Sequence, residues 1–202
     1  ETSGANSSTE TPITLAPDGT TTYTVTVGAG GNGGVGPSPQ GGRYGQPGGN
    51  SEFFKNGTSY PDVKRVRAVG GGGGQGYGVA PVPQMNGGSG GGAICSPSPY
   101  AGGTGNTTDP NHPQVQGYAG GDCTPSYVSP YAGGGGGGAG RVGAPDNPST
   151  PLTRSTGGYG LQCLIAHNPT NPESPIGAPG PDSNNGYFAG GGGGGSYAAS
   201  GG

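Results

Sequence analysis

Residues 131–138 read Tyr-Ala followed by six glycines, and runs of this kind recur along the chain. Further glycine blocks occupy residues 70–74, 90–92 and 190–195. Glycine has no side chain to bury, so these runs can contribute to a fold only through their backbone N–H and C=O groups. Two interpretations follow. The runs are flexible linkers, or they form an ordered stack of polyproline-II-like strands that hydrogen-bond to one another through the main chain.

Aromatic residues lead into several of the runs. Tyr187-Phe-Ala precedes the last run, and shorter Tyr-Ala-Gly-Gly sequences begin at Tyr100 and Tyr118. Serine barely enters the runs, whereas flexible linkers mix serine and glycine freely. These features favour the ordered stack, in which the aromatic residues would cap its ends. The predicted fold class is an irregular all-β or polyglycine-II (PPII) helix bundle with a few short β-strands and no α-helix.

The composition excludes several other classes. Glycine and proline account for 54 and 22 of the 202 residues, but without the strict Gly-X-Y period of collagen. The net charge is only −3, whereas disordered chains usually combine low hydrophobicity with strong net charge. No apolar span is long enough for a membrane helix, so no membrane insertion is expected. Seven Lys and Arg residues are too few to indicate a nucleic-acid partner.

Short strands are predicted at three places within one domain. Residues 1–11 are polar and are expected to form a tail or linker, and residues 12–202 are expected to form a single glycine-rich domain with long Pro/Asn/Tyr loops. Ile13–Val27 is the clearest strand region: residues 15–19 supply a turn, and residues 20–27 alternate Thr with larger residues, the pattern of a half-buried strand. A second strand is expected at Val63–Val69, with solvated cations, and a third within residues 157–165.

Candidate cofactor and catalytic motifs do not have the context that their chemistry needs. Residues 28–33 match G-x-G-x-x-G, but the following sequence cannot begin the helix that holds a pyrophosphate. Ser, His and Asp residues are dispersed in loops, without a nucleophile elbow. We therefore expect no cofactor and no enzymatic activity.

The cysteine count is odd, which predicts one disulfide and one free thiol in an extracellular protein. Cys95 and Cys123 each follow a glycine-rich block and bracket a single loop, so their pairing is favoured over pairings with Cys163. No C-x-x-C spacing occurs, and no metal site is expected.

The order of motifs resembles the glycine-rich domain of phage tail and tail-fibre proteins. That pattern has a Thr/Val-rich strand ending in Val-Gly-Ala-Gly-Gly, here residues 24–31, followed by Gly-Gly-x-Ser-x-Phe, here residues 48–53. A short strand then enters a glycine run, here residues 66–74, and Gly-Gly-x-Gly-Leu appears later, here residues 157–161. The composition is also similar to that of polyglycine-II tail-fibre adhesins. The long Pro/Asn loops and the cysteines depart from the family pattern.

This resemblance implies a non-enzymatic virion or extracellular domain that recognises a host-cell receptor, an outer-membrane protein or a glycan, through its loops. Other fibre or virion proteins and further copies of the chain are the other partners expected. Tyrosine offers a large contact area with a polar tip and little loss of rotamer freedom. The expected contact residues are Tyr100, His112, Tyr127 and His167. The alternatives are a structural subunit of a filament, capsid decoration or coat, and an ice-binding protein.

Overall fold

The computed structural model describes residues 4–5, 7, 14–34, 44–57, 65–76, 81–94, 99–106, 115–124, 131–146, 155–163, 180–181, 186–194 and 196–197. These residues contain no α-helix, and their regular elements are short antiparallel strands and one 3₁₀ turn. The described part of the chain is therefore mostly extended backbone, as the sequence predicts.

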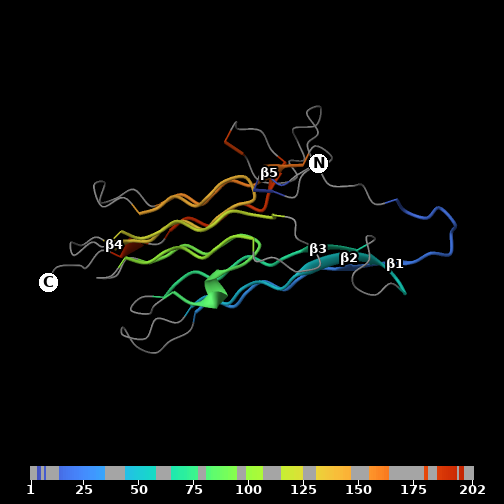
Figure 1. Cartoon of the computed structure of the whole chain (residues 1–202), viewed down its shortest axis with the longest axis horizontal. Coiled ribbons are helices and arrows are strands. Elements are labelled where there is room, and N and C mark those ends of the chain that lie inside the picture. The colour runs from blue at the N-terminus through green and yellow to red at the C-terminus, as the bar shows by residue number, and fades with distance from the viewer. Residues whose placement is uncertain are drawn as a thin grey trace.

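Three short strands form an antiparallel sheet toward one end of the molecule (Figure 1). They are β1 (Tyr23–Thr26), β2 (Ser51–Lys55) and β3 (Arg65–Ala68), in the order β1-β2-β3. Val25, Phe53 and Val66 lie opposite one another across the sheet. The ring of Phe53 also stacks on that of Tyr23, with 5.4 Å between the ring centroids. Aromatic and β-branched pairs of this kind stabilise a small sheet.

Strand β1 is shorter than the alternating sequence predicts. The carboxylate of Asp18 accepts hydrogen bonds from the N–H groups of Thr20 and Thr21 and from the Thr21 hydroxyl. These bonds hold a bend at residues 18–20, so the strand begins only at Tyr23. The bond from the Thr21 hydroxyl, together with the backbone N–H groups of Thr21 and Thr20, holds the pKa of Asp18 well below its usual value.

The prediction that the cations of the second strand are simply solvated is wrong for Arg67. Glu52 and Arg67 face each other across β2 and β3, and the Arg67 Nε lies 2.5 Å from the Glu52 Oε1. Both side chains are largely covered, with exposed fractions of 24% and 13% for Arg67 and Glu52. This pair links the last two strands of the sheet.

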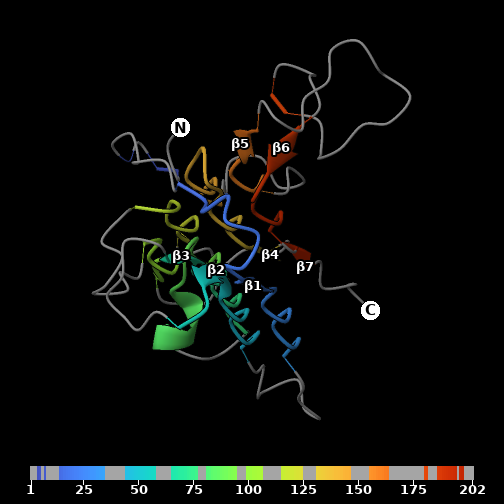
Figure 2. The same ribbon diagram turned by 90° about the vertical axis from the view of Figure 1, so that its right-hand side faces the viewer.

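Glycine-rich segments extend from the sheet along the long axis of the molecule. In Figure 1 they run side by side as wavy traces, and Figure 2, which looks along this axis, shows several of them end-on as narrow coils. Segments 44–50, 69–76, 86–94, 99–106, 115–124, 133–140 and 141–146 are joined by backbone hydrogen bonds. Nearly all of these bonds connect different segments, so the segments form a hydrogen-bonded stack.

Segment 133–140 lies inside this stack. All seven N–H groups from Gly134 to Gly140 donate to carbonyl oxygens, at distances of 2.7 to 2.9 Å. The acceptors, in order, are Ala93, Ala144, Gly192, Gly90, Arg141, Ala189 and Tyr159. The first three belong to three different segments, and the next three belong to the same segments in the same order. Successive N–H groups therefore point in three directions with a period of three residues.

Carbonyl groups follow the same rule in segment 86–94. The six carbonyls from Gly88 to Ala93 each accept a backbone N–H. The donors, in order, are Asn106, Gly72, Gly137, Gly103, Gln75 and Gly134. They come in turn from segments 99–106, 69–76 and 133–140, and then from the same three again. A side chain on most inner positions would collide with a neighbouring backbone, which explains why these segments are glycine.

The aromatic lead-ins form strands where the sequence suggested caps. Tyr131–Ala132 is strand β4 and pairs with β7 (Ser196–Tyr197), and Tyr187–Phe188 is strand β6 and pairs with β5 (Leu161–Gln162). The expected late strand thus exists, as a two-residue element. These lead-ins are therefore paired with other segments through their backbones.

A stretch that reads as a loop contains the most buried large side chain. The 3₁₀ turn η1 (Pro83–Met85) lies within residues 79–86, and its proline takes the first helical position, where a missing N–H costs nothing. Met85 is 1% exposed and forms an apolar cluster with Ala93 and Cys123. Its carbonyl accepts the N–H of Gly91, so η1 is fastened to the stack.

We predict that Gly91→Ala destabilises the domain and that Gly74→Ala does not. A Cβ on Gly91 would collide with the carbonyl of Gly73, far inside the 3.0 Å that real Cβ atoms respect, whereas a Cβ on Gly74 meets no atom within 4 Å. Overpacking of this kind costs about 1–3 kcal/mol. Alanine at a compatible, open position stabilises a protein by about 0.4–1 kcal/mol.

Thermal or urea unfolding of the two variants measures this difference directly. Equal stabilities for Gly91→Ala and Gly74→Ala would contradict the claim that close backbone approach determines where glycine is needed.

Candidate functional site: one end of the glycine stack

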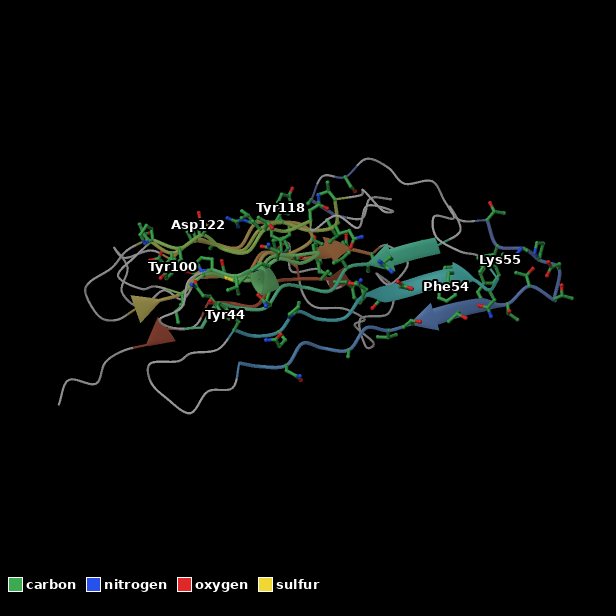
Figure 3. All side chains as sticks on the ribbon, turned by 60° about the horizontal axis from the view of Figure 1, so that its bottom comes forward. Tyr44, Phe54, Lys55, Tyr100, Tyr118 and Asp122 are labelled. Carbon is green, nitrogen blue, oxygen red and sulfur yellow. The ribbon has the colours of Figure 1, made fainter. Side chains whose placement is uncertain are left out.

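One of the four expected contact residues lies in the described part of the chain. Tyr100 is described, whereas His112, Tyr127 and His167 lie outside the described residues. The described residues that flank these three in the sequence show where the chain leaves the described part of the structure and where it re-enters it. Figure 3 places Tyr100, Asp122 and Tyr44 toward one end and Phe54 and Lys55 toward the other.

Tyr127 is flanked by residues at the same end as Tyr100. It lies between Thr124 and Tyr131, and Thr124 directly follows Cys123, which pairs with Tyr100 through two backbone hydrogen bonds. We refer to Tyr100, Asp122, Cys123, Thr124 and Asp146 as the Tyr100 end.

His112 is flanked by residues beside the sheet. The segment that contains it begins after Asn106 and ends before Val115. Asn106 donates to Gly88, which in turn donates to Gly70, two residues after β3. The Gln116 side chain accepts the N–H of Val69 at 2.7 Å and donates to the carbonyl of Arg67 at 2.7 Å.

His167 follows β5, which Figure 1 shows closer to β3 than to β4. The structure therefore brings the flanks of Tyr127 to Tyr100, and it places the flanks of the two histidines elsewhere.

The Tyr100 end sits on the apolar cluster. Met85, Ala93 and Cys123 are 1%, 2% and 3% exposed, and the half-buried side chains of Tyr44, Val82 and Tyr100 pack against them. Burial of one side of the Tyr100 ring fixes its position while part of it stays in contact with solvent. A tyrosine held in this way is suited to contact a ligand with little loss of side-chain entropy.

Cysteine chemistry differs between the two ends. Cys123 takes part in a disulfide, and Cys163, after β5, is a free thiol. The favoured partner, Cys95, lies outside the described residues, so the Cys95–Cys123 pairing stays a prediction. A disulfide at Cys123 restrains the backbone directly beside Tyr100.

Two aspartates tie neighbouring segments together at the Tyr100 end. The exposed Asp122 accepts the N–H of Gly102 at 2.9 Å. Asp146 is only 5% exposed, and its Oδ1 accepts both the N–H of Thr124 at 2.5 Å and the Thr124 hydroxyl at 2.9 Å. The N–H of Asp146 donates to the carbonyl of Asp122 at 3.1 Å. The point at which the chain departs toward Tyr127 is thus held by a buried carboxylate.

Sequence reasoning missed Met85, Asp122 and Asp146. One available signal for Met85 was that it is the only methionine in a chain with few large apolar residues, because such residues are seldom exposed. No comparable signal marked Asp146, which lies in a Pro/Asn-rich stretch and gains its role from a segment 22 residues away.

Within the described residues, no group of three or more His, Cys, Asp or Glu side chains is placed to hold a metal ion. No helix in that part of the chain is long and apolar enough to cross a membrane.

These features define a glycine-rich, non-α-helical domain with a few short antiparallel strands. A family model described as a glycine-rich domain matches residues 2–202, and the chain belongs to this family. The match begins inside residues 1–11, and within them Ala5 donates its N–H to the carbonyl of Ala139 at 2.7 Å. No curated protein and no solved structure matches the chain.

We predict that Asp146→Ala destabilises the domain by about 1–3 kcal/mol, because the N–H of Thr124 loses a charged acceptor next to a buried site. Asp122→Ala removes one bond at an exposed carboxylate and should cost about 1 kcal/mol or less. Thermal unfolding of the two variants at neutral pH compares them. An equal loss of stability would mean that the buried carboxylate has no special role at this end.

Proposed function

We propose that the glycine segments form a polyglycine-II scaffold. A polyproline-II strand has three residues per turn and no internal hydrogen bonds, so its N–H and C=O groups point outward in three directions. The order of acceptors along residues 134–139, which repeats after three residues, supports this packing. So does the repeated order of donors to residues 88–93, and so do the narrow coils seen end-on in Figure 2.

Circular dichroism tests the scaffold. We expect a polyproline-II spectrum that is lost in one cooperative thermal transition, because each segment depends on backbone bonds to its neighbours. A flexible linker would give a weak signal that declines gradually with temperature. Gly91→Ala should lower the midpoint of the transition relative to Gly74→Ala, which shows that the spectrum reports the packed segments.

We propose further that the domain is a non-enzymatic recognition module that binds a receptor on a host-cell surface, as in the phage tail fibres whose motif order it resembles. The observation that carries this proposal is the construction of the Tyr100 end. There a disulfide at Cys123, a buried carboxylate at Asp146 and the apolar cluster hold the bases of the connecting segments. A surface held rigid before binding loses less entropy when it binds.

The Tyr100 end is the better candidate of the two ends. Tyr100 is half-buried, and the exposed Asp122 carboxylate accepts the N–H of Gly102, two residues after Tyr100. An aromatic side chain and a hydrogen-bond acceptor therefore lie at the same end (Figure 3). This combination suits the hydroxyl groups of a glycan and the backbone of a protein loop equally. At the opposite end, the exposed Val25 lies opposite Phe53 in the three-stranded sheet and offers an apolar surface instead.

Binding of the fluorescently labelled domain to a panel of intact bacterial strains tests this function. On a strain that binds, Tyr127→Ala should weaken binding by about tenfold or more, the effect of losing one aromatic anchor. His112→Ala is the matched control, because its flanking residues lie at the other end, and it should bind like the parent. Protease or periodate treatment of the cells distinguishes a protein receptor from a glycan.

Both variants must keep the parent's circular dichroism spectrum for this comparison to count. Loss of binding with His112→Ala and not with Tyr127→Ala would reject the Tyr100 end. Absence of binding to any cell type in a broad panel would reject the recognition function and leave the scaffold proposal standing.

A further inference from the structure

Segment 28–34 forms an open border of the stack. Residues 29–34 are exposed, and the carbonyls of Ala29 and Asn32 accept N–H groups of the neighbouring segment 44–50. The N–H of Gly28 donates to the hydroxyl of Ser51, but no N–H from residue 29 to residue 34 donates to any described residue. The inner segment 133–140 uses seven consecutive N–H groups. Among the described residues, segment 28–34 is therefore bonded on one side only, and its other side is exposed.

Nothing in the described part of the chain requires glycine at two positions on the open side. A Cβ on Gly28 or Gly31 would collide with backbone atoms of segment 44–50. A Cβ on Gly30 or Gly33 would meet no atom within 4 Å, and neither residue has a left-handed backbone. Glycine at such positions costs stability relative to alanine. Gly30 and Gly33 are three residues apart, so they face the same direction on a three-residue turn.

This border also lacks the usual protection against association. Exposed edges in soluble proteins are commonly blunted by charged side chains or proline. Segment 28–34 has neither, and it follows Val25 and Val27, which are 69% and 81% exposed. An extended backbone partner would meet no charge along the segment and an apolar patch at its beginning.

We infer that segment 28–34 is a self-association edge, where the same segment of a second copy of this chain packs antiparallel to it. The inference rests on the proposed polyglycine-II packing. Only a partner segment with few side chains can approach closely enough to use the open N–H groups, and the chain itself supplies such a segment. Antiparallel and parallel neighbours both occur inside the stack: segment 99–106 runs antiparallel to segment 86–94, and segment 69–76 runs parallel to it.

A two-fold axis relating two identical segments closes the assembly at a dimer. Seven residues on each side make a small interface, below the size of a stable complex, so the dimer should form only at high protein concentration.

Sedimentation equilibrium from about 10 μM to about 1 mM tests the inference. We expect the parent domain to shift from monomer toward dimer over this range. The double variant Gly30→Ala/Gly33→Ala should raise the dissociation constant by about tenfold or more, because two methyl groups would hold the backbones apart. Gly74→Ala is the matched control, since its Cβ is equally unobstructed but lies on a different segment, and it should dimerise like the parent.

Each other outcome has a defined meaning. A parent that stays monomeric at about 1 mM, or a double variant that dimerises like the parent, overturns the inference. Weakening by Gly192→Ala, whose Cβ also meets no atom within 4 Å, would place the contact at segment 186–194 and likewise overturn it. Circular dichroism separates failure of the edge from failure of the scaffold: an intact polyproline-II spectrum with no dimer rejects the edge alone.

Discussion

The structure depends on one requirement: backbone N–H and C=O groups that leave water must find partners. In an α-helix these partners lie within the same helix, and in a wide sheet they lie on the two flanking strands. In the glycine stack they lie on three neighbours in rotation, as the acceptors of residues 134–139 show. Neighbouring backbones must then approach so closely that inner positions have no room for a Cβ. The abundance of glycine is the consequence of this geometry, despite the conformational entropy that each glycine loses on folding.

Side-chain burial is secondary to backbone hydrogen bonding in this structure, and it acts locally. Met85, Ala93 and Cys123 form a small cluster under one end of the stack, far from an ordinary core in extent. A cluster of this size contributes only a few kcal/mol by area, so it cannot balance the ordering of the whole chain. What it does is fix one end. With the disulfide at Cys123 and the buried Asp146, it holds the positions from which connecting segments depart.

The sequence predicted the non-α-helical character and the approximate places of β1, β3 and β5, because these depend on local properties. It did not predict the central strand β2 or the strands at the aromatic lead-ins. The alternation of Thr with Val and Tyr indicated β1, and the absence of any helical period excluded helices. Contacts that depend on the register between segments could not be predicted. Arg67 meets Glu52 only because β2 and β3 pair as they do, and Asp146 reaches Thr124 only because two segments of the stack end together. Irregular connecting lengths conceal that register from any periodic pattern.

The same geometry places different demands on the positions inside the stack and on the stretches between its segments. Inner positions such as Gly91 have no room for a side chain, whereas the stretches of sequence between the segments are rich in proline and polar residues. The entropy of closing a loop rises only slowly with its length, so these stretches can lengthen or change composition at little cost to the stack. Positions on the border, such as Gly30, have room for a side chain although they lie within a glycine segment. An unobstructed glycine such as Gly30 differs from Gly74, whose Cβ is equally free, because Gly30 also lies in an exposed segment whose N–H groups donate to no described residue.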